Sequence, residues 1–285
     1  MKLFVSPILH QGVSCEVVLH DTLNDRSGHQ PEQSSPIILV RERAMSQQNN
    51  QKLAEDLVSA LALQHQPLAI SFTQEPMPGI DLFSDAMPTP TEDGRTGRVP
   101  AGCVFWMKAA TNTFSTVAED HANCSVGSVT HGFKTLEEVG SKSDVGALVG
   151  AGWVAPEMFP QIPVVKERFR YVTYGTLKDS QSVPDVVFLR INAKQAMTLS
   201  DALPGLRFEG KPQCHIIAIA KEQETVAVSV GCMLSRVRTG LPNSEMTCAI
   251  PGSRLAEVVQ IIKTTAVIDS TVANYASEDS RRFSS

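Results

Sequence analysis

The residues with the clearest chemical potential lie in one short segment, residues 115–133, STVAEDHANCSVGSVTHGF. It holds the thiol of Cys124 between the imidazoles of His121 and His131, and it contains few large apolar side chains. A thiolate is both a nucleophile and a ligand for soft metals, and an imidazole serves as a base or as a ligand. Gly127 adds backbone N–H groups that can stabilise a negative charge. This segment is therefore the predicted centre of a functional site, with Cys124 in its middle.

Three other cysteines occupy comparable settings, namely Cys103 in GCVFWMKAA, Cys214 in QCHIIAIAK and Cys232 in SVGCMLSRVRTG. The spacing of the six cysteines contains no CxxC or CxxxC pair, so zinc-ribbon and bacterial-ferredoxin patterns are absent. A shared thiolate site would therefore have to be assembled from distant segments of the chain.

A similarity between two parts of the sequence, which we call the internal echo, suggests how that assembly could happen. Residues 67–133 and 184–241 each run through a strand that opens on proline, a cysteine segment, a second strand and a cysteine loop. The two loops, CSVGSVTHGF and CMLSRVRTGL, share a cysteine, a valine, a glycine and an apolar residue at matching positions. A duplicated unit with a pseudo-twofold axis would bring the four cysteines towards one centre. The alternative is coincidence, with the cysteines used as small buried hydrophobic residues.

The chain resembles an uncharacterised prokaryotic family, domain of unknown function 169. The resemblance rests on GCVFWMKA, EDHANCSVGSVTHGF, EGKPQCHIIA and SVGCMLSRVRTG, and it covers roughly residues 50–283. It implies that Cys103, Cys124, Cys214 and Cys232 fall in the recurrent motifs of the family. It implies no activity.

The first hypothesis for these residues is a metal site ligated by Cys103, Cys124, Cys214 and Cys232. Thiolates suit iron–sulfur clusters and zinc, and we expect an iron–sulfur cluster, with zinc or haem as alternatives. A Gly/Ser-rich loop can donate N–H groups to cluster sulfides, and a histidine can replace one ligand. Such a cluster would serve redox chemistry or, if one iron stays open, lyase chemistry on a small molecule.

A second hypothesis is a thiol enzyme in which Cys124 is the nucleophile and His121 or His131 is the base. It explains residues 115–133 but gives no role to the other three cysteines. Whether the chain is an enzyme at all stays open between these hypotheses.

A third hypothesis is a non-enzymatic binding or sensor protein that holds haem or a small molecule, with Trp106 and Trp153 lining the pocket. In any of these cases Arg236 and Arg238 could bind an anionic substrate, although arginines are more commonly solvated on the surface.

Composition limits the partners. With 25 Lys and Arg against 30 Asp and Glu, the formal net charge is -5 and no basic run occurs, so nucleic acid is not expected as a partner. No apolar run approaches the length of a membrane helix, about 20 residues, and the N-terminus lacks a secretory signal. We expect a cytoplasmic protein whose partner is a small-molecule substrate or a redox protein. Association into a homo-oligomer is left open.

The apolar periodicity predicts an α/β or α+β fold with a mixed sheet. We expect helices at 49–63, 192–203 and 253–265, and strands at 67–72, 171–177, 185–191, 225–231 and 245–251. Residues 75–100 read as a long loop of the lid or binding type. Residues 1–48 are expected to be a flexible N-terminal extension, or an upstream segment before a true start at Met45, and residues 49–285 a single globular domain.

Overall fold

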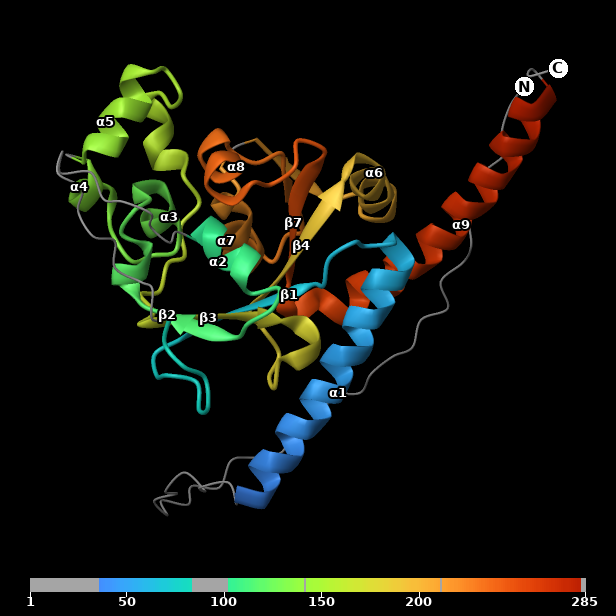
Figure 1. Ribbon diagram of the computed structural model, residues 1–285, viewed down its shortest axis with the longest axis horizontal. Coiled ribbons are helices and arrows are strands. Elements are labelled where there is room, and N and C mark those ends of the chain that lie inside the picture. The colour runs from blue at the N-terminus through green and yellow to red at the C-terminus, as the bar shows by residue number, and fades with distance from the viewer. Residues whose placement is uncertain (1–35, 84–101, 141, 211, 283–285) are drawn as a thin grey trace, which may run out of the picture.

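The computed structural model describes residues 36–83, 102–140, 142–210 and 212–282 (Figure 1). These residues form one mixed sheet of seven strands in the order β2-β3-β1-β4-β7-β6-β5. Neighbouring strands are antiparallel except for the parallel pair β5 and β6. The strands are β1 (Leu68–Thr73), β2 (Phe114–Thr116), β3 (Tyr171–Thr176), β4 (Val186–Asn192), β5 (Arg207–Glu209), β6 (Ala227–Ser229) and β7 (Glu245–Pro251). The predicted mixed α/β architecture is confirmed.

Helices cover both faces of this sheet. They are α1 (Pro36–Leu61), α2 (Gly102–Lys108), α3 (Ser125–Thr130), α4 (Leu136–Val139), α5 (Ser143–Gly150), α6 (Ala193–Ala202), α7 (Cys214–Gln223), α8 (Met233–Thr239) and α9 (Leu255–Arg282). Short 3₁₀ turns occupy Ala118–His121, Pro156–Gln161, Leu177–Asp179 and Gly252–Arg254.

Two apolar cores lie on opposite sides of the sheet because strand side chains alternate between its faces. In β4, Val186 and Phe188 join the core beneath α2 and α7, whereas Val187 and Leu189 join the core beneath α1, α6 and α9. Burial on both faces explains why this strand reads as an almost unbroken apolar run.

Local capping signals explain where some helices begin. Asn192 caps α6, since its side chain accepts a hydrogen bond from the Gln195 N–H, and the Gln195 side chain accepts one from the Asn192 N–H in return. The same reciprocal arrangement joins Thr135 and Glu138 at α4. Both helices therefore begin with a capping box, and the helix predicted at 192–203 is confirmed as α6.

The long helices α1 and α9 pack against each other and project from opposite sides of the body (Figure 1). The structure begins α1 at Pro36, whereas the sequence pattern predicted a helix from residue 49. Buried Asn50 anchors this helix by donating hydrogen bonds to the carbonyl oxygens of Ser180 and Ser182, at 3.1 and 2.8 Å. The predicted flexible extension thus overlaps α1 over residues 36–48, and residues 1–35 lie outside the described part. Most of the predicted loop, residues 84–100, also lies outside it.

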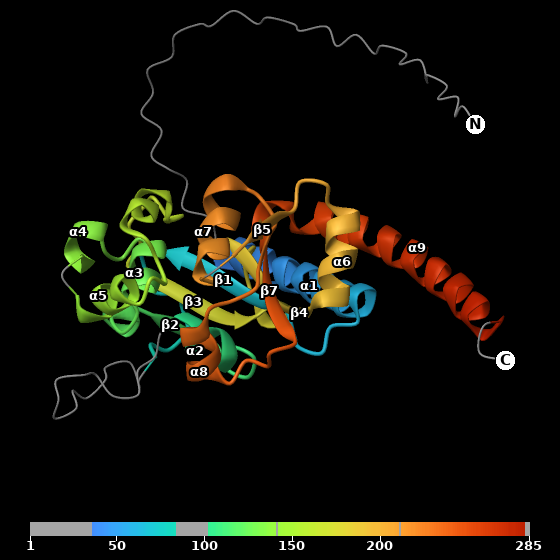
Figure 2. The ribbon, with the colours of Figure 1, turned by 90° about the horizontal axis from the view of Figure 1, so that it is seen from above.

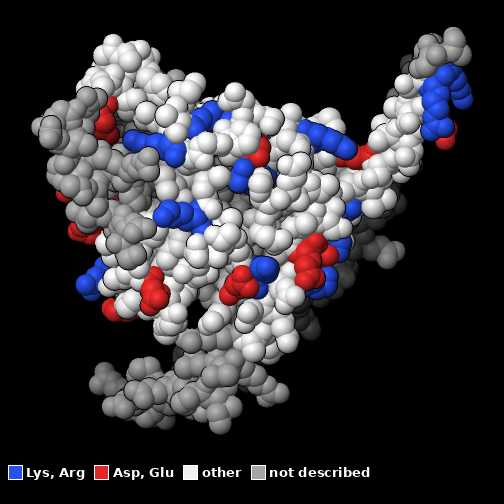
Figure 3. All heavy atoms as spheres, in the orientation of Figure 1, with Lys and Arg blue, Asp and Glu red and all other residues white. Residues whose placement is uncertain are grey.

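No helix in the described ranges is long and apolar enough to cross a membrane. On the face seen in Figure 3, acidic and basic side chains are interspersed and form no large patch of one sign.

The sheet has the same element order on either side of its central pair, β1 and β4. Outward from that pair, one side continues with β3 and β2 and the other with β7 and β6. In each case the strand that follows the proposed repeat, β3 or β7, lies between the first strand of that repeat and the strand before its cysteine loop, whereas β5 has no counterpart among the described strands of the first repeat. Helix α2 packs on α8, and α3 packs on α7, so each half contributes to both helix pairs (Figure 2). The internal duplication itself stays a prediction, because element order alone does not establish that the two halves superpose.

Candidate functional site

Four cysteines from four separate segments line one small cavity, the cysteine pocket, with a volume of about 30 Å³. Its lining residues are Gly102, Cys103, Trp106, Cys124, Gly127, Pro212, Gln213, Cys214, Cys232, Leu234, Ser235 and Arg238. The cavity lies on the side of the sheet covered by α2 and α7. Gly127, predicted from the sequence as a neighbour of Cys124, is among the lining residues.

Each of these cysteines lies where a helix begins. Cys103 is the second residue of α2 and Cys214 the first residue of α7, whereas Cys124 and Cys232 are the N-caps of α3 and α8. An N-cap side chain normally accepts a hydrogen bond from a backbone N–H in the first turn, a role usually filled by Ser, Thr, Asp or Asn. Here sulfur fills that role at both caps, so the side-chain direction of Cys124 and Cys232 is fixed by helix capping.

Burial raises the pKa of three of the pocket thiols, those of Cys103, Cys214 and Cys232. It raises the pKa of Cys103 to about 11, and the nearby sulfur of Cys124 adds to this rise. Burial also raises the pKa of Cys214 well above its usual value, and that of Cys232 to a smaller extent. In each of these cases the Cys124 sulfur pushes the pKa further up, which places all four sulfurs within electrostatic reach of one another.

Arg238 supplies positive charge to the pocket. Its guanidinium group lies near the sulfurs of Cys124 and Cys103, and Nη2 donates a hydrogen bond to the carbonyl oxygen of Asn123 at 3.1 Å. Burial works to lower the pKa of Arg238, but the two sulfurs outweigh this effect and the net direction is upward. At Cys103 this positive charge lowers the pKa and so works against the effect of burial.

Arg236, the other arginine considered from the sequence, has a different role. It is not among the lining residues of the cysteine pocket. Its guanidinium group donates to four backbone carbonyl groups, those of Val230, Leu241, Pro242 and Glu245. These bonds fasten α8 and the loop after it to the end of β6 and the start of β7. Two residues along a helix point in nearly opposite directions, so only one of the pair faces the pocket.

Two further side chains of the pocket carry buried polar atoms without a hydrogen-bond partner in the described part of the chain. The atoms concerned are both side-chain amide atoms of Gln213 and the indole nitrogen of Trp106. The residues are only 1% and 4% exposed. A buried polar atom without a hydrogen bond costs free energy, so these atoms support the presence of a ligand that bonds to them in this cavity. Gly231, at φ +86°, makes room for Gln213, because a Cβ atom there would lie 2.8 Å from its amide nitrogen.

His131 lies outside the lining of the cysteine pocket, in an aromatic layer beside it. Its Nδ1–H donates to the carbonyl oxygen of Gly127 at 2.8 Å, and the Tyr174 hydroxyl donates to its Nε2 at 3.3 Å. Burial lowers the pKa of His131 to about 4. The N–H of Gly127 in turn donates to Cys124 Sγ at 3.4 Å. His131 therefore supports the loop that holds Cys124 and does not touch the pocket.

His121 occupies the same layer, with its ring centroid 5.0 Å from that of His131. The Thr116 hydroxyl donates to the carbonyl oxygen of Val172 at 2.9 Å, so it accepts the Nε2–H of His121 at 3.0 Å. Burial lowers the pKa of His121 well below its usual value, and its Nδ1 has no partner among the described residues. Both histidines are thus neutral, and both lie behind the cysteine loop.

The sequence analysis did not single out Gln213, Ser235 or Pro212. One signal could have found the first of these, because Gln213 precedes Cys214 as Gly102 precedes Cys103, at the same position of the proposed repeat. Ser235 carries no such signal, since its contribution is a backbone N–H.

The fit of a metal can be judged from the same geometry. Within the described ranges, no three side chains of His, Cys, Asp or Glu are already arranged to hold one metal ion. The pocket thus offers four converging thiols, an arginine and unpartnered polar atoms, but no preformed coordination shell. Taking up a cluster requires the cysteine side chains to turn and the cavity of about 30 Å³ to widen.

The comparisons with known proteins agree with the resemblance seen in the motifs. The model of the family described as uncharacterised ArCR, domain of unknown function 169, matches residues 56–261, which include all four pocket cysteines. No curated protein and no solved structure matches the chain.

Proposed function

Since the chain belongs to the uncharacterised ArCR family, domain of unknown function 169, whose description states no activity, we propose its function from the cysteine pocket. We propose that Cys103, Cys124, Cys214 and Cys232 ligate an iron–sulfur cluster, used for redox or lyase chemistry on a small molecule. The observation that carries this proposal is that four thiols from four helix starts line a single cavity.

Cys248 shows what a cysteine used only for packing looks like in this chain. It is fully buried in β7, in the core on the opposite face of the sheet, and burial alone raises its pKa. Among the cysteines that the structure describes, no other belongs to that core. Packing explains Cys248, but it gives no reason for four thiols to share one cavity.

Electrostatics favours a cation between these sulfurs. Deprotonating several buried thiols at once is opposed by burial and by the repulsion among the sulfurs. Metal binding removes both obstacles, because thiolate ligation releases the protons to solvent and the metal neutralises the charge. Arg238 and the N–H groups of Gly127 and Ser235 would offset the negative charge left on a thiolate-ligated cluster.

The residues of the pocket have distinct roles in this proposal. The four cysteines would hold the cluster, and the amide of Gln213 and the indole N–H of Trp106 would be available as hydrogen-bond donors beside it. Such a cluster would supply one-electron transfer, or a Lewis-acidic iron if one ligand position is open. Because the described residues hold no preformed ligand set, the cysteine side chains would have to turn to ligate it.

A second candidate, a thiol nucleophile at Cys124, is supported by one observation. Cys124 is more exposed than the other three pocket cysteines and lies against Arg238. Among the described residues no histidine lines the pocket, so Arg238 would be the charged group beside the reacting sulfur.

We also propose a cytoplasmic location, because reduced thiols persist there and the site needs all four of them. The expected partner is a small-molecule substrate or a redox protein.

Anaerobic purification followed by visible absorption and metal analysis tests the proposal. We expect a brown protein whose thiolate-to-iron absorption bleaches on reduction with dithionite. A colourless protein without iron, after anaerobic reconstitution with ferrous iron and sulfide, would end the proposal. In that case, much faster alkylation of Cys124 than of Cys103, Cys214 and Cys232 would favour the thiol enzyme.

A further inference from the structure

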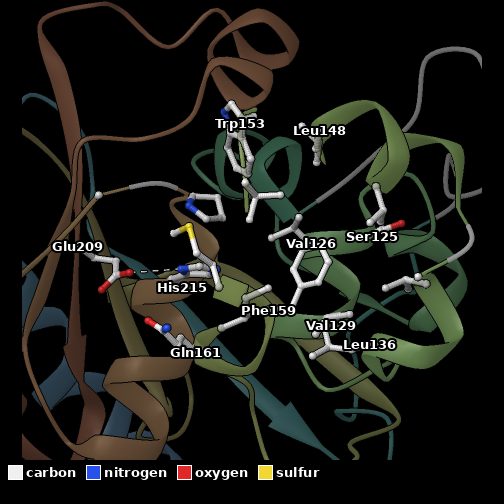
Figure 4. A pocket seen from close by; sticks show the side chains of 18 of the residues that line it. Ser125, Val126, Val129, Leu136, Leu148, Trp153, Phe159, Gln161, Glu209 and His215 are labelled. Atoms are coloured by element: carbon white, nitrogen blue, oxygen red, sulfur yellow. Dashed lines mark hydrogen bonds and ion pairs between the residues drawn. The ribbon is translucent and has the colours of Figure 1, made fainter. Parts of the chain in front are cut away.

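A second and much larger cavity, the apolar pocket, lies beside the cysteine pocket and has a volume of about 430 Å³. One side is formed by α3, α4, α5 and the turn Pro156–Gln161, and the other by β5 and the start of α7 (Figure 4). Most of its surface is apolar, contributed by residues that include Val126, Val129, Leu148, Trp153 and Phe159. Protein interiors rarely leave a void of this size, whereas small-molecule sites commonly have it.

One edge of the apolar pocket is polar. His215 and Glu209 lie together there, with the Nδ1 of His215 at 3.4 Å from a carboxylate oxygen of Glu209 (Figure 4). Glu209 also pairs with Arg207 at 3.0 Å. A carboxylate only accepts hydrogen bonds, so Nδ1 carries the proton, and the neutral imidazole keeps a lone pair at Nε2.

The Nε2 atom of His215 has no partner in the described part of the chain, although the residue is only 7% exposed. A buried acceptor at the wall of a cavity costs free energy unless a ligand donates to it. The remaining polar groups are few, and the Arg207–Glu209 pair brings no net charge. The pocket therefore suits a neutral molecule.

The apolar pocket and the cysteine pocket share their walls. Cys124 lines the cysteine pocket while the next residue, Ser125, lines the apolar one, and Cys214 and His215 divide in the same way. Pro212 lines both cavities. Only the wall formed by these neighbouring residues would thus separate a molecule in the apolar pocket from the cysteines.

We propose that the apolar pocket binds a small neutral organic molecule with an aromatic or branched apolar body and one O–H or N–H group, which donates to Nε2 of His215. The binding stands on its own, and only the role of this molecule as the substrate of the metal centre rests on the proposed function.

Isothermal titration of the full-length protein with a matched pair of probes tests this site. 1-Naphthol and 1-methoxynaphthalene share the same apolar body, but only the first can donate a hydrogen bond. We expect 1-naphthol to bind about five- to tenfold more tightly, as one buried hydrogen bond allows. His215→Leu should abolish that preference and leave binding of 1-methoxynaphthalene intact.

Leu148→Trp should weaken both probes at least about tenfold by filling the cavity, while Val267→Trp, on exposed α9, should change neither. Absence of binding by both probes, binding that Leu148→Trp leaves unchanged, or a preference that survives His215→Leu would each overturn the proposal. Iron analysis of the same samples separates this proposal from the proposed cluster. Probe binding without iron would support the apolar pocket and count against the cluster. Iron without probe binding would support the cluster and count against the apolar pocket.

Discussion

Cys124 and Cys232 have the same structural role in two different parts of the fold. Each is the N-cap of a short helix, and each sulfur accepts a hydrogen bond from the backbone N–H three residues later, from Gly127 at 3.4 Å and from Ser235 at 3.3 Å. Each also follows a strand, β2 or β6, that pairs antiparallel with the next strand of the chain, β3 or β7. The two caps therefore aim their sulfurs into one cavity from opposite halves of the molecule.

Capping and metal binding by Cys124 can be separated by two substitutions. Serine is a better N-cap than cysteine, so Cys124→Ser should keep the free energy of unfolding of the metal-free protein within about 0.5 kcal/mol. Cys124→Ala loses the cap and should cost about 1 kcal/mol. Urea denaturation under reducing, metal-free conditions measures both. Equal stability of the two variants would show that the sulfur makes no useful cap.

Arg238 should control the reactivity of the thiols beside it. Arg238→Gln removes the charge that lowers the pKa of Cys103, so alkylation of this residue by iodoacetamide should slow about three- to tenfold. Arg238→Lys should keep part of the effect. Mass spectrometry of the metal-free protein near pH 8 provides the rates, with Arg254→Gln as the control on the exposed surface. Unchanged rates in Arg238→Gln would contradict the placement of this charge.

The buried histidines predict that acid weakens the fold. The pKa of His131 falls from its ordinary 6.5 to about 4 on folding, so the unfolded chain binds more protons between these values. Stability should be full above about pH 7 and decline as the pH falls through 6.5 towards 4, by an amount on the order of 3 kcal/mol for His131. His121 and His215 act in the same direction.

The measurement for this prediction is the free energy of unfolding between pH 7 and pH 4.5. His131→Asn should flatten the slope, whereas Val172→Ala should lower stability equally at every pH, because Val172 is buried but does not titrate. A profile that is flat in the wild type over this range would refute the assignment of neutral, buried histidines.

Gly231 should tolerate no side chain. At φ +86°, and with a Cβ atom only 2.8 Å from the amide nitrogen of Gln213, Gly231→Ala should destabilise the fold by about 1–2 kcal/mol and displace Gln213. Gly146→Ala is the matched control, since this residue lies within α5 in open space and alanine there should stabilise by about 0.5–1 kcal/mol. Similar stabilities of both variants in urea would contradict the close approach at Gly231.

Apolar periodicity was sufficient to predict the mixed fold, the strands β1, β3, β4, β6 and β7, and helix α6. It was not sufficient for α1, whose first half joins the apolar run IILV to a polar stretch and gives no amphipathic signal, and whose anchoring by Asn50 depends on a loop 130 residues away. Long-range contacts of this kind leave no local pattern in the sequence.

The candidate site, too, could be predicted from the sequence only in part. Residue type and the internal echo pointed to the four cysteines, because thiols in matching contexts are rare in a sequence. They could not tell Arg236 from Arg238, which lie two residues apart on one helix. Nor could they show that His121 and His131 lie outside the lining of the cysteine pocket, since their hydrogen bonds to Thr116 and Tyr174 exist only once the sheet has formed.

The central claim is that four cysteines hold one iron–sulfur cluster, and the most direct test is the iron and acid-labile sulfide content per chain after anaerobic purification. The wild type and Cys248→Ala should both contain iron and sulfide in equal amounts, because Cys248 lies in the opposite core. Replacing Cys103, Cys124, Cys214 and Cys232 together by serine should reduce both to background while the circular dichroism spectrum stays the same. Iron and sulfide that persist in the folded fourfold variant, or that are missing from a folded, anaerobically reconstituted wild type, would contradict the account.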